Sequence, residues 1–244
     1  MLIAGNWKLN CNIREAIEIS SSISNTLADK NLISDVVLFP PVIYIDLIKN
    51  KINNSKICLG AQDCSIHISG AHTGDISASM LYEIGCKYTI VGHSERRINK
   101  HESNNDIYLK AKNVINNKMI PIICVGENAK DRESGNALNV IEKQLSESIP
   151  KNEKNFEFII AYEPIWAIGS GKVPTLESIN EMFNMIRLWL LNNGIDKSIK
   201  ILYGGSVNKG NANEFFSCKN LGGLLIGGVS LKASEFSEIC IMAG

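Results

Sequence analysis

Short runs of apolar residues alternate along the chain with longer segments that are mostly polar. The runs are nearly continuous, which is typical of strands that are buried on both faces of a parallel sheet. They occupy Leu2–Ala4, Val36–Phe39, Ile57–Gly60, Tyr88–Val91, Met119–Val125, Phe156–Ala161, Ile201–Tyr203 and Leu224–Ile226. The pattern therefore predicts eight strands, each followed by a polar segment.

The polar segments show the spacing of amphipathic helices. In three of them, apolar residues recur three or four positions apart, so that they share one helical face. These residues are Ile13, Ala16, Ile17 and Ile23; Ile107, Ala111, Val114 and Ile115; and Ile179, Met182, Phe183, Ile186 and Leu190. Ser103 with Asp106 is predicted to cap the second helix, and Thr175 is predicted to cap the third.

Repeated strand–helix units fit two architectures, an open doubly wound sheet and a closed eight-stranded barrel. The chain has 244 residues, and a barrel of this kind usually has about 250. No linker, low-complexity tract or spacer rich in proline and glycine divides the sequence. We therefore predict an α/β fold, a (β/α)8 TIM barrel that forms a single domain over residues 1–244.

Composition and charge limit the class of partner. Hydrophobic residues make up 45% of the chain and charged residues 20%, which is sufficient for a large core. The 25 basic and 25 acidic residues give a formal net charge of zero. This balance argues against a nucleic-acid surface or a polybasic membrane contact, whereas a local site for a small anionic substrate needs no global charge.

The sequence also predicts where the protein resides. No apolar run is long enough for a membrane-spanning helix, and the N-terminus lacks the basic and apolar regions of a signal peptide. The seven cysteines are scattered without a C-x-x-C motif, as expected of small core residues in a reducing compartment. We expect a cytoplasmic protein.

One segment, which reads FEFIIAYEPIWAIGSGKVP, places an acid at the end of a predicted strand. A buried carboxylate such as Glu163 is costly at this position unless a site uses it. Pro164 and Pro174 bracket a loop that contains Gly169 and Gly171, so the loop can move as one piece on stiff ends. The alternative is an ordinary strand-to-helix connection with a chance acid.

Other predicted strands also end in residues that carry chemistry. In a barrel, functional groups lie where strands end and the following loops begin. Lys8, His93 and Glu163 follow the first, fourth and sixth strands, so all three would open onto one face. Glycines follow strands seven and eight, where exposed backbone N–H groups can hold a phosphate. Taken singly, these residues also fit a surface lysine, a core histidine and tight turns, but their common position favours a site.

Seven stretches carry a closer identification. They are GNWKLN (Gly5–Asn10), GAHTGDIS (Gly70–Ser77), VGHSERR (Val91–Arg97), CVGE (Cys124–Glu127), AYEPIWAIGSGK (Ala161–Lys172), YGGSV (Tyr203–Val207) and GGVSLK (Gly228–Lys232). VGHSERR and AYEPIWAIG together are highly specific, and the chain resembles the triosephosphate isomerase family along nearly its full length.

The resemblance implies that the chain interconverts dihydroxyacetone phosphate and D-glyceraldehyde 3-phosphate, in glycolysis and gluconeogenesis. Glu163 matches the catalytic base of the family and His93 its electrophile. The residues that match substrate contacts are Asn6 and Lys8, and those that match supporting neighbours are Ser94 and Glu95. The positions that match phosphate-binding backbone amides are Gly169, Ser206, Gly227 and Gly228.

These roles fit the chemistry of the reaction. A proton next to a carbonyl is weakly acidic, so a base must remove it while the developing enediolate is stabilised. Glu163 can move the proton, His93 can donate a hydrogen bond to the substrate oxygens, and Lys8 can offset the negative charge. A neutral histidine and a water-excluding loop are already documented for this family. The reaction requires no metal ion or organic cofactor, and the sequence shows no clustered metal-ligand pattern.

The resemblance also implies a homodimer, in which Gly70–Ser77 reaches into the second subunit and completes its site. The sequence departs from the family at His72, where a bulky aromatic is common, and at Asp63, where asparagine is usual. Both lie near the expected interface, so its strength or pH response can differ. Pro174 stands at the second hinge of the loop in place of a small residue and can stiffen its opening.

Two alternative interpretations assign the chain to other functional classes. Another phosphate-binding barrel enzyme, such as a sugar-phosphate epimerase or an aldolase, would share the glycines after strands seven and eight. It would not carry the combination of Lys8, His93 and Glu163. A non-catalytic barrel scaffold would tolerate the loss of Glu163 or a disrupted loop, and the sequence retains both.

Overall fold

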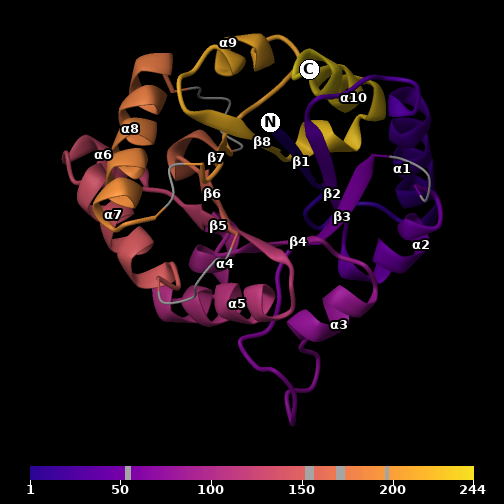
Figure 1. Cartoon of the computed structure of the whole chain (residues 1–244), viewed down its shortest axis with the longest axis horizontal. Coiled ribbons are helices and arrows are strands. Elements are labelled where there is room, and N and C mark those ends of the chain that lie inside the picture. Colours follow the sequence, from indigo (N-terminus) through magenta and orange to yellow (C-terminus); the bar gives the residue numbers. More distant parts are fainter. Residues whose placement is uncertain (53–55, 152–156, 169–173, 196–197) are drawn as a thin grey trace.

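Eight parallel strands close into a barrel in the computed structural model of the chain, which describes residues 1–52, 56–151, 157–168, 174–195 and 198–244 (Figure 1). The strands are β1 (Leu2–Asn6), β2 (Asp35–Phe39), β3 (Ile57–Ala61), β4 (Tyr88–Val91), β5 (Ile120–Val125), β6 (Ile159–Tyr162), β7 (Ile201–Tyr203) and β8 (Leu221–Ile226). Each strand pairs with the next in sequence, and β8 pairs with β1. This closure confirms the predicted barrel and excludes the open sheet.

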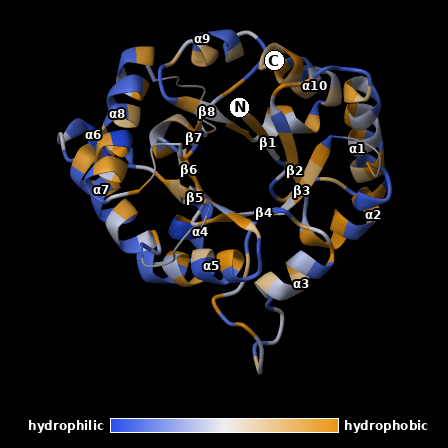
Figure 2. Cartoon of the chain, in the orientation of Figure 1, coloured by the Kyte–Doolittle hydropathy of each residue, from blue (hydrophilic) through white to orange (hydrophobic). Residues whose placement is uncertain are grey.

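Helices surround the barrel and cover its outer surface (Figure 1). They are α1 (Ile13–Leu27), α2 (Ile45–Lys49), α3 (Ala78–Glu83), α4 (Ser94–Asn99), α5 (Asn104–Asn116), α6 (Ala129–Glu133), α7 (Ala137–Ser148), α8 (Leu176–Asn192), α9 (Ala212–Phe216) and α10 (Ala233–Met242). Short 3-10 helices span Val42–Tyr44, Ile165–Ala167 and Gly228–Leu231. Figure 2 shows apolar residues along the strands and polar residues on the outer helix faces, as the alternation of the sequence predicts.

The core has two layers because successive side chains of each strand point to opposite sides. Outward-pointing residues pack against the helices, and inward-pointing residues fill the barrel. Inside the barrel, a Cβ atom on Gly60 would lie 2.2 Å from the ring of Phe39, so only glycine fits opposite this aromatic side chain. The barrel is therefore a packed core, and a site can form only at its ends.

The predicted helix caps are confirmed. Ser103 and Asp106 form a reciprocal capping box at the start of α5, with Asp106 N–H donating to Ser103 Oγ at 3.1 Å. Thr175 Oγ1 accepts the backbone N–H of Ser178 at the start of α8. These side chains satisfy backbone donors that a helix leaves free in its first turn.

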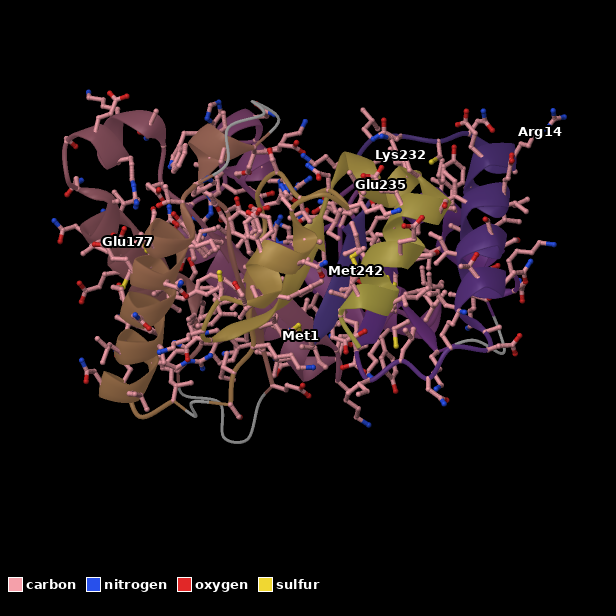
Figure 3. The ribbon with its side chains drawn as sticks, turned by 90° about the horizontal axis from the view of Figure 1, so that it is seen from above. Met1, Arg14, Glu177, Lys232, Glu235 and Met242 are labelled. Carbon is pink, nitrogen blue, oxygen red and sulfur yellow. The ribbon has the colours of Figure 1, made fainter. Side chains whose placement is uncertain are left out.

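The predicted buried face of α1 is wrong at its first position. Ile13 is 60% exposed, whereas Ala16, Ser20, Ile23, Ser24 and Leu27 are buried. Arg14, which follows Ile13, lies at the outer upper corner of Figure 3, so the first turn extends to the edge of the molecule. Spacing alone identifies a helical face but cannot show how far the neighbouring elements reach along it.

The carboxyl ends of the strands define one open face of the barrel. In Figure 3, Met1, which precedes β1, lies on the lower side, and Lys232, which follows β8, lies toward the upper side. Among the residues that the structure describes, no helix has both the length and the apolar character needed to cross a membrane. β6 begins at Ile159, later than predicted; Phe158 before it is buried, and Phe156 lies outside the described residues.

Candidate active site

Asn6 and Lys8 lie where β1 ends at the open face. Asn6 Oδ1 accepts the backbone N–H of Lys8 at 3.0 Å, and Gln62 Nε2 donates to the Lys8 carbonyl at 2.9 Å. These contacts hold Lys8 at a φ of 52°, in the left-handed region that residues other than glycine rarely adopt. The Lys8 ammonium lies 2.6 Å from Glu95 Oε1. The cation is thus fixed in position by backbone geometry and by one carboxylate.

His93 follows β4 and caps the N-terminus of α4. Its Nδ1 accepts the backbone N–H of Glu95 at 3.2 Å. In the neutral ring this bond assigns the proton to Nε2, which lies 3.0 Å from Glu163 Oε1. The side chain is only 7% exposed. His93 therefore presents a buried N–H donor toward the interior of the site, which is the form that an electrophile of this kind needs.

Glu163 follows β6 and is 2% exposed. Its backbone N–H donates to the Val125 carbonyl at 2.8 Å, which fixes the end of β6 against β5. One carboxylate oxygen, Oε2, accepts the backbone N–H of Ser94 at 3.0 Å, and the other faces His93. The sequence therefore predicted correctly that this acid stands at the carboxyl end of a buried strand.

Burial and pairing act in opposite directions on both groups of this pair. Burial raises the pKa of the Glu163 carboxyl, but His93 and the N–H group of Ser94 outweigh it and hold the pKa below its ordinary value. Burial lowers the pKa of the His93 imidazole, and the neighbouring Glu163 carboxylate brings it above its ordinary value. Glu163 is therefore ionised at neutral pH, as a base must be. If Glu163 moves away, His93 loses the partner that most favours its charged form.

The loops after β7 and β8 complete the site. A cavity of about 480 Å³ opens at this end of the barrel. Its lining includes Asn6, Lys8, His93, Glu163, Ser206, Gly227 and Gly228. The structure thus brings together seven predicted residues from five strand ends, while Ser94 and Glu95 support His93, Glu163 and Lys8 through the contacts given above. Gly169, also predicted, lies outside the described residues.

Glu127 is a fully buried acid at the end of β5 for which the sequence alone predicts no role. Its Oε1 accepts hydrogen bonds from Trp166 Nε1 at 2.9 Å and from the Tyr162 hydroxyl at 3.1 Å. The Arg132 guanidinium lies 3.8 Å from the same oxygen. Glu127 therefore anchors the start of the loop that follows Glu163. Its signal in the sequence was the CVGE stretch, which places an acid after the fifth strand as Glu163 stands after the sixth.

Known proteins resemble this chain in sequence and in structure. The profile of the family described as "Triosephosphate isomerase" matches residues 1–243. Triosephosphate isomerase from Jannaschia sp. (strain CCS1) is 41% identical over 240 residues, which is 98% of this chain and 96% of that protein. Its counterpart from Ruegeria sp. (strain TM1040) is 40% identical over the same shares. The crystal structure of triosephosphate isomerase from Bartonella henselae superposes with a TM-score of 0.89 at 34% identity and covers 99% of this chain and 98% of that one.

Proposed function

Because the chain belongs to the triosephosphate isomerase family, we propose that Glu163, His93 and Lys8 carry out its reaction. The protein is an isomerase of glycolysis that interconverts dihydroxyacetone phosphate and D-glyceraldehyde 3-phosphate. The observation that supports these roles is the buried Glu163–His93 pair, at 3.0 Å, beside Lys8 in one cavity. The test is isomerisation of glyceraldehyde 3-phosphate by the purified chain beside the Glu163→Gln variant considered in the Discussion.

In the proposed mechanism Glu163 removes a proton from the carbon next to the substrate carbonyl and returns it to the neighbouring carbon. A carboxylate whose pKa lies below its ordinary value is ionised before substrate arrives. Binding of substrate between Glu163 and His93 replaces their direct contact, so each side chain then faces a substrate atom instead of the other. The base and the electrophile thus become available at the same time.

His93 and Lys8 stabilise the negative charge that develops on the substrate oxygens. His93 Nε2 donates a hydrogen bond, and its orientation is fixed in advance by the bond from Glu95 N–H to Nδ1. Lys8 lines the same cavity and supplies a positive charge. Both groups are held by the protein before reaction, so little reorganisation is needed when the charge appears.

Ser206, Gly227 and Gly228 are proposed to bind the substrate phosphate. These residues line the cavity after the ends of β7 and β8, where barrel enzymes often hold phosphate. A Cβ atom on Gly228 meets nothing within 4 Å, so a larger residue there can be accommodated by the fold. Because Gly228 lines the cavity, a larger side chain at this position is expected to compete with the phosphate for space.

Replacement of Gly228 by valine is expected to weaken phosphate binding more than it affects turnover or stability. We expect the dissociation constant for inorganic phosphate and KM to rise about tenfold, with a smaller change in kcat and an unchanged melting temperature. Calorimetric titration with phosphate and steady-state kinetics measure these quantities. An unaltered phosphate affinity in the folded variant would contradict the cradle.

We also propose that the protein is a homodimer, with the interface around the segment between β3 and α3. This segment projects beyond the ring of helices in Figure 1. Leu9 is 97% exposed and Ile68, on the projecting segment, is 72% exposed. Exposed apolar side chains also include Ile13, Ile43, Met80, Tyr82 and Ile98. Apolar surface of this kind marks sites of association between proteins.

The same segment carries two of the departures from the family. The rings of His67 and His72 are stacked in parallel with their centroids 3.4 Å apart, and His72 is exposed. Asp63, at the base of the segment, contacts Arg96 and Lys110.

The third departure from the family, Pro174, precedes α8. It is buried next to residues that the structure does not describe.

Ile68→Asp is expected to shift the protein from dimer to monomer. Burying a charge in an apolar interface is unfavourable, so we expect the dimer dissociation constant to rise at least about tenfold. The matched control is Leu188→Asp on α8, since Leu188 is 59% exposed and lies outside the proposed interface. Sedimentation equilibrium measures both. A monomeric wild type, or equal effects of the two substitutions, would contradict the proposed interface.

We propose that residues 1–244 form one domain, supported by the closure of a single barrel from β1 to β8. We propose a cytoplasmic location, supported by seven free cysteines, of which five are buried.

A further inference from the structure

Four charged side chains form a closed ring beside the active site. Arg96 Nη2 lies 2.7 Å from Asp63 Oδ2, and Arg96 Nε lies 2.7 Å from Glu102 Oε1. Lys110 Nζ completes the ring at 2.7 Å from Asp63 Oδ1 and 2.6 Å from Glu102 Oε1. Two cations and two anions alternate, so the ring is neutral when every member is charged. Glu102 and Lys110 are nearly buried, with side chains 8% and 6% exposed, so water screens these contacts weakly.

The ring joins the end of a barrel strand to the helix that carries the active-site histidine. Asp63 lies two residues after the end of β3, Lys110 lies in α5, and Arg96 lies in α4. The backbone N–H of Arg96 donates to the His93 carbonyl at 2.8 Å, within the first turn of this short helix. A displacement of Arg96 is therefore expected to displace the backbone of His93 as well.

A second arginine holds α4 from the other side. Arg97 donates to the carbonyl of Gly92 at 2.9 Å and to that of Cys124, on β5, at 2.8 Å. Arg97 thus fixes α4 to its own strand end and to β5, whereas Arg96 fixes it toward β3. Losing either anchor leaves the orientation of α4 determined by the other.

The orientation of α4 matters because three groups at its N-terminus face catalytic residues. The imidazole of His93 lies 3.0 Å from Glu163, the N–H of Ser94 donates to Glu163 at 3.0 Å, and Glu95 lies 2.6 Å from Lys8. A small rotation of α4 changes all three distances at once. Displacements of this kind lower the catalytic rate, because the reacting groups must be aligned to within a fraction of an ångström.

We propose that Asp63 is a positioning residue for the isomerisation: its ionised carboxylate holds Arg96 and thereby sets the orientation of α4 and of the groups that α4 presents to the substrate. The inference rests on the roles proposed above for His93 and Glu163. Asp63 does not itself contact the substrate space. It lines a second cavity, of about 570 Å³, and is not among the residues that line the proposed substrate cavity.

Protonation of Asp63 removes the charge that holds Arg96, so a change of pH can weaken this ion pair without a change in the sequence. Burial raises the pKa of the carboxyl, Lys110 and Arg96 lower it, Glu102 raises it, and the result is about 6. The charged and titratable groups that face Asp63 are these three, the adjacent Cys64, and Asp75, Asp106 and His67 across the cavity. Burial raises the pKa of Cys64 to about 12, and hydrogen bonds from Ser103 lower that of Asp106, so neither changes charge near pH 6.

The same shift has a consequence for stability, with a definite sign. Folding raises this pKa from 3.8 to about 6, so the folded protein binds the proton more tightly than the unfolded chain. The stabilisation from this group is complete below about pH 3.8 and is lost as the pH rises through about 6. Ionised Asp63 therefore lowers stability at neutral pH, and an uncharged side chain of equal size is not expected to unfold the protein there.

The test compares wild type with Asp63→Asn across pH 5 to 8, where the asparagine side chain stays neutral. We expect the ratio of wild-type to variant kcat to be near one at pH 5 and to rise to about 3–10 at pH 8, with a midpoint near pH 6. Titration of the substrate phosphate occurs with both proteins and cancels in the ratio. Asp106→Asn is the control, since Asp106 lines the same cavity but does not contact Arg96; its ratio should be independent of pH.

The results that would overturn the role of Asp63 differ from those that would overturn the proposed catalytic roles. A ratio for Asp63→Asn that stays constant over this range, whether at one or at a higher value, overturns the proposal, because the effect would then not follow the charge. A pH-dependent ratio that disappears when the enzyme concentration is raised also overturns it, because the loss would then reflect dissociation of the dimer. Failure of the proposed catalytic roles has a different signature, namely a Glu163→Gln variant that keeps its turnover.

Discussion

Glu163→Gln is expected to lower kcat by about 10²- to 10⁴-fold, which is the usual contribution of a general base. Glutamine has the shape of glutamate but cannot take up a proton at neutral pH. Its side-chain oxygen can still accept the N–H of Ser94, which is 3.0 Å from Oε2 in the wild type, so the local structure should persist. Turnover in both directions and the affinity for inorganic phosphate are the measurements. Phosphate affinity should change little, because the substitution leaves the proposed phosphate-binding glycines unchanged.

The control is Glu127→Gln. Glu127 is also a buried acid at a strand end, but it does not line the cavity, and an amide oxygen can keep its bonds from Trp166 and Tyr162. We expect turnover to change far less than in Glu163→Gln. Equal losses in the two variants would show that any disturbance of a buried acid inactivates the protein, and the assignment of the base would fail. Equal losses of turnover and phosphate affinity in Glu163→Gln would also contradict a purely catalytic role.

Gly204→Ala is expected to lower kcat by about 100-fold, although it introduces no charge and removes no catalytic group. A Cβ atom on Gly204 would lie 2.9 Å from Cγ and 3.5 Å from Oε1 of Glu163. The backbone cannot easily move away, because Gly204 N–H donates to the Tyr162 carbonyl at 2.9 Å. The Glu163 side chain must therefore shift, and a displaced base removes the proton poorly. Overpacking should also lower the free energy of unfolding by about 1–3 kcal/mol.

A double-mutant cycle distinguishes this mechanism from general damage. If Gly204→Ala acts only by displacing the Glu163 carboxylate, it should have almost no further effect in the Glu163→Gln background. Kinetics of the two single variants and the double variant, each checked for folding by thermal melting, give the coupling. Additive losses would mean that the alanine acts elsewhere in the barrel.

The barrel itself was predictable because its determinants are local and repeated. Each continuous apolar run, such as Tyr88–Val91, can be buried on both faces only in a parallel sheet covered by helices, and the number of repeats matches the closed form. The helix cap formed by Ser103 and Asp106 could also be predicted, because both residues lie within one turn of the helix. The exposed Ile13 was not predictable, because its environment depends on where neighbouring helices end.

The sequence predicted which residues would gather at one end of the barrel, but it did not predict the contacts between them. Lys8, His93 and Glu163 each stand at a strand end, and the barrel topology alone brings strand ends to one face. The distances within the pair of Glu163 and His93, and the tautomer that follows from the Glu95 N–H, depend on how α4 is seated. The ring around Asp63 could not be anticipated, since its members are far apart in sequence and only the packing of β3, α4 and α5 brings them together.

The sequence by itself determined the fold and its family, together with the identity of the residues at the open end of the barrel, because hydrophobic periodicity and short motifs act over a few residues at a time. Only the tertiary structure decided which of these residues touch, which are buried, and which charges change their pKa. Those properties come from desolvation and from distances of about 3 Å between atoms that the chain brings together from separate strands. The sequence alone identifies Glu163 as an acid, but its pKa is lowered only because His93 and Ser94 lie beside it.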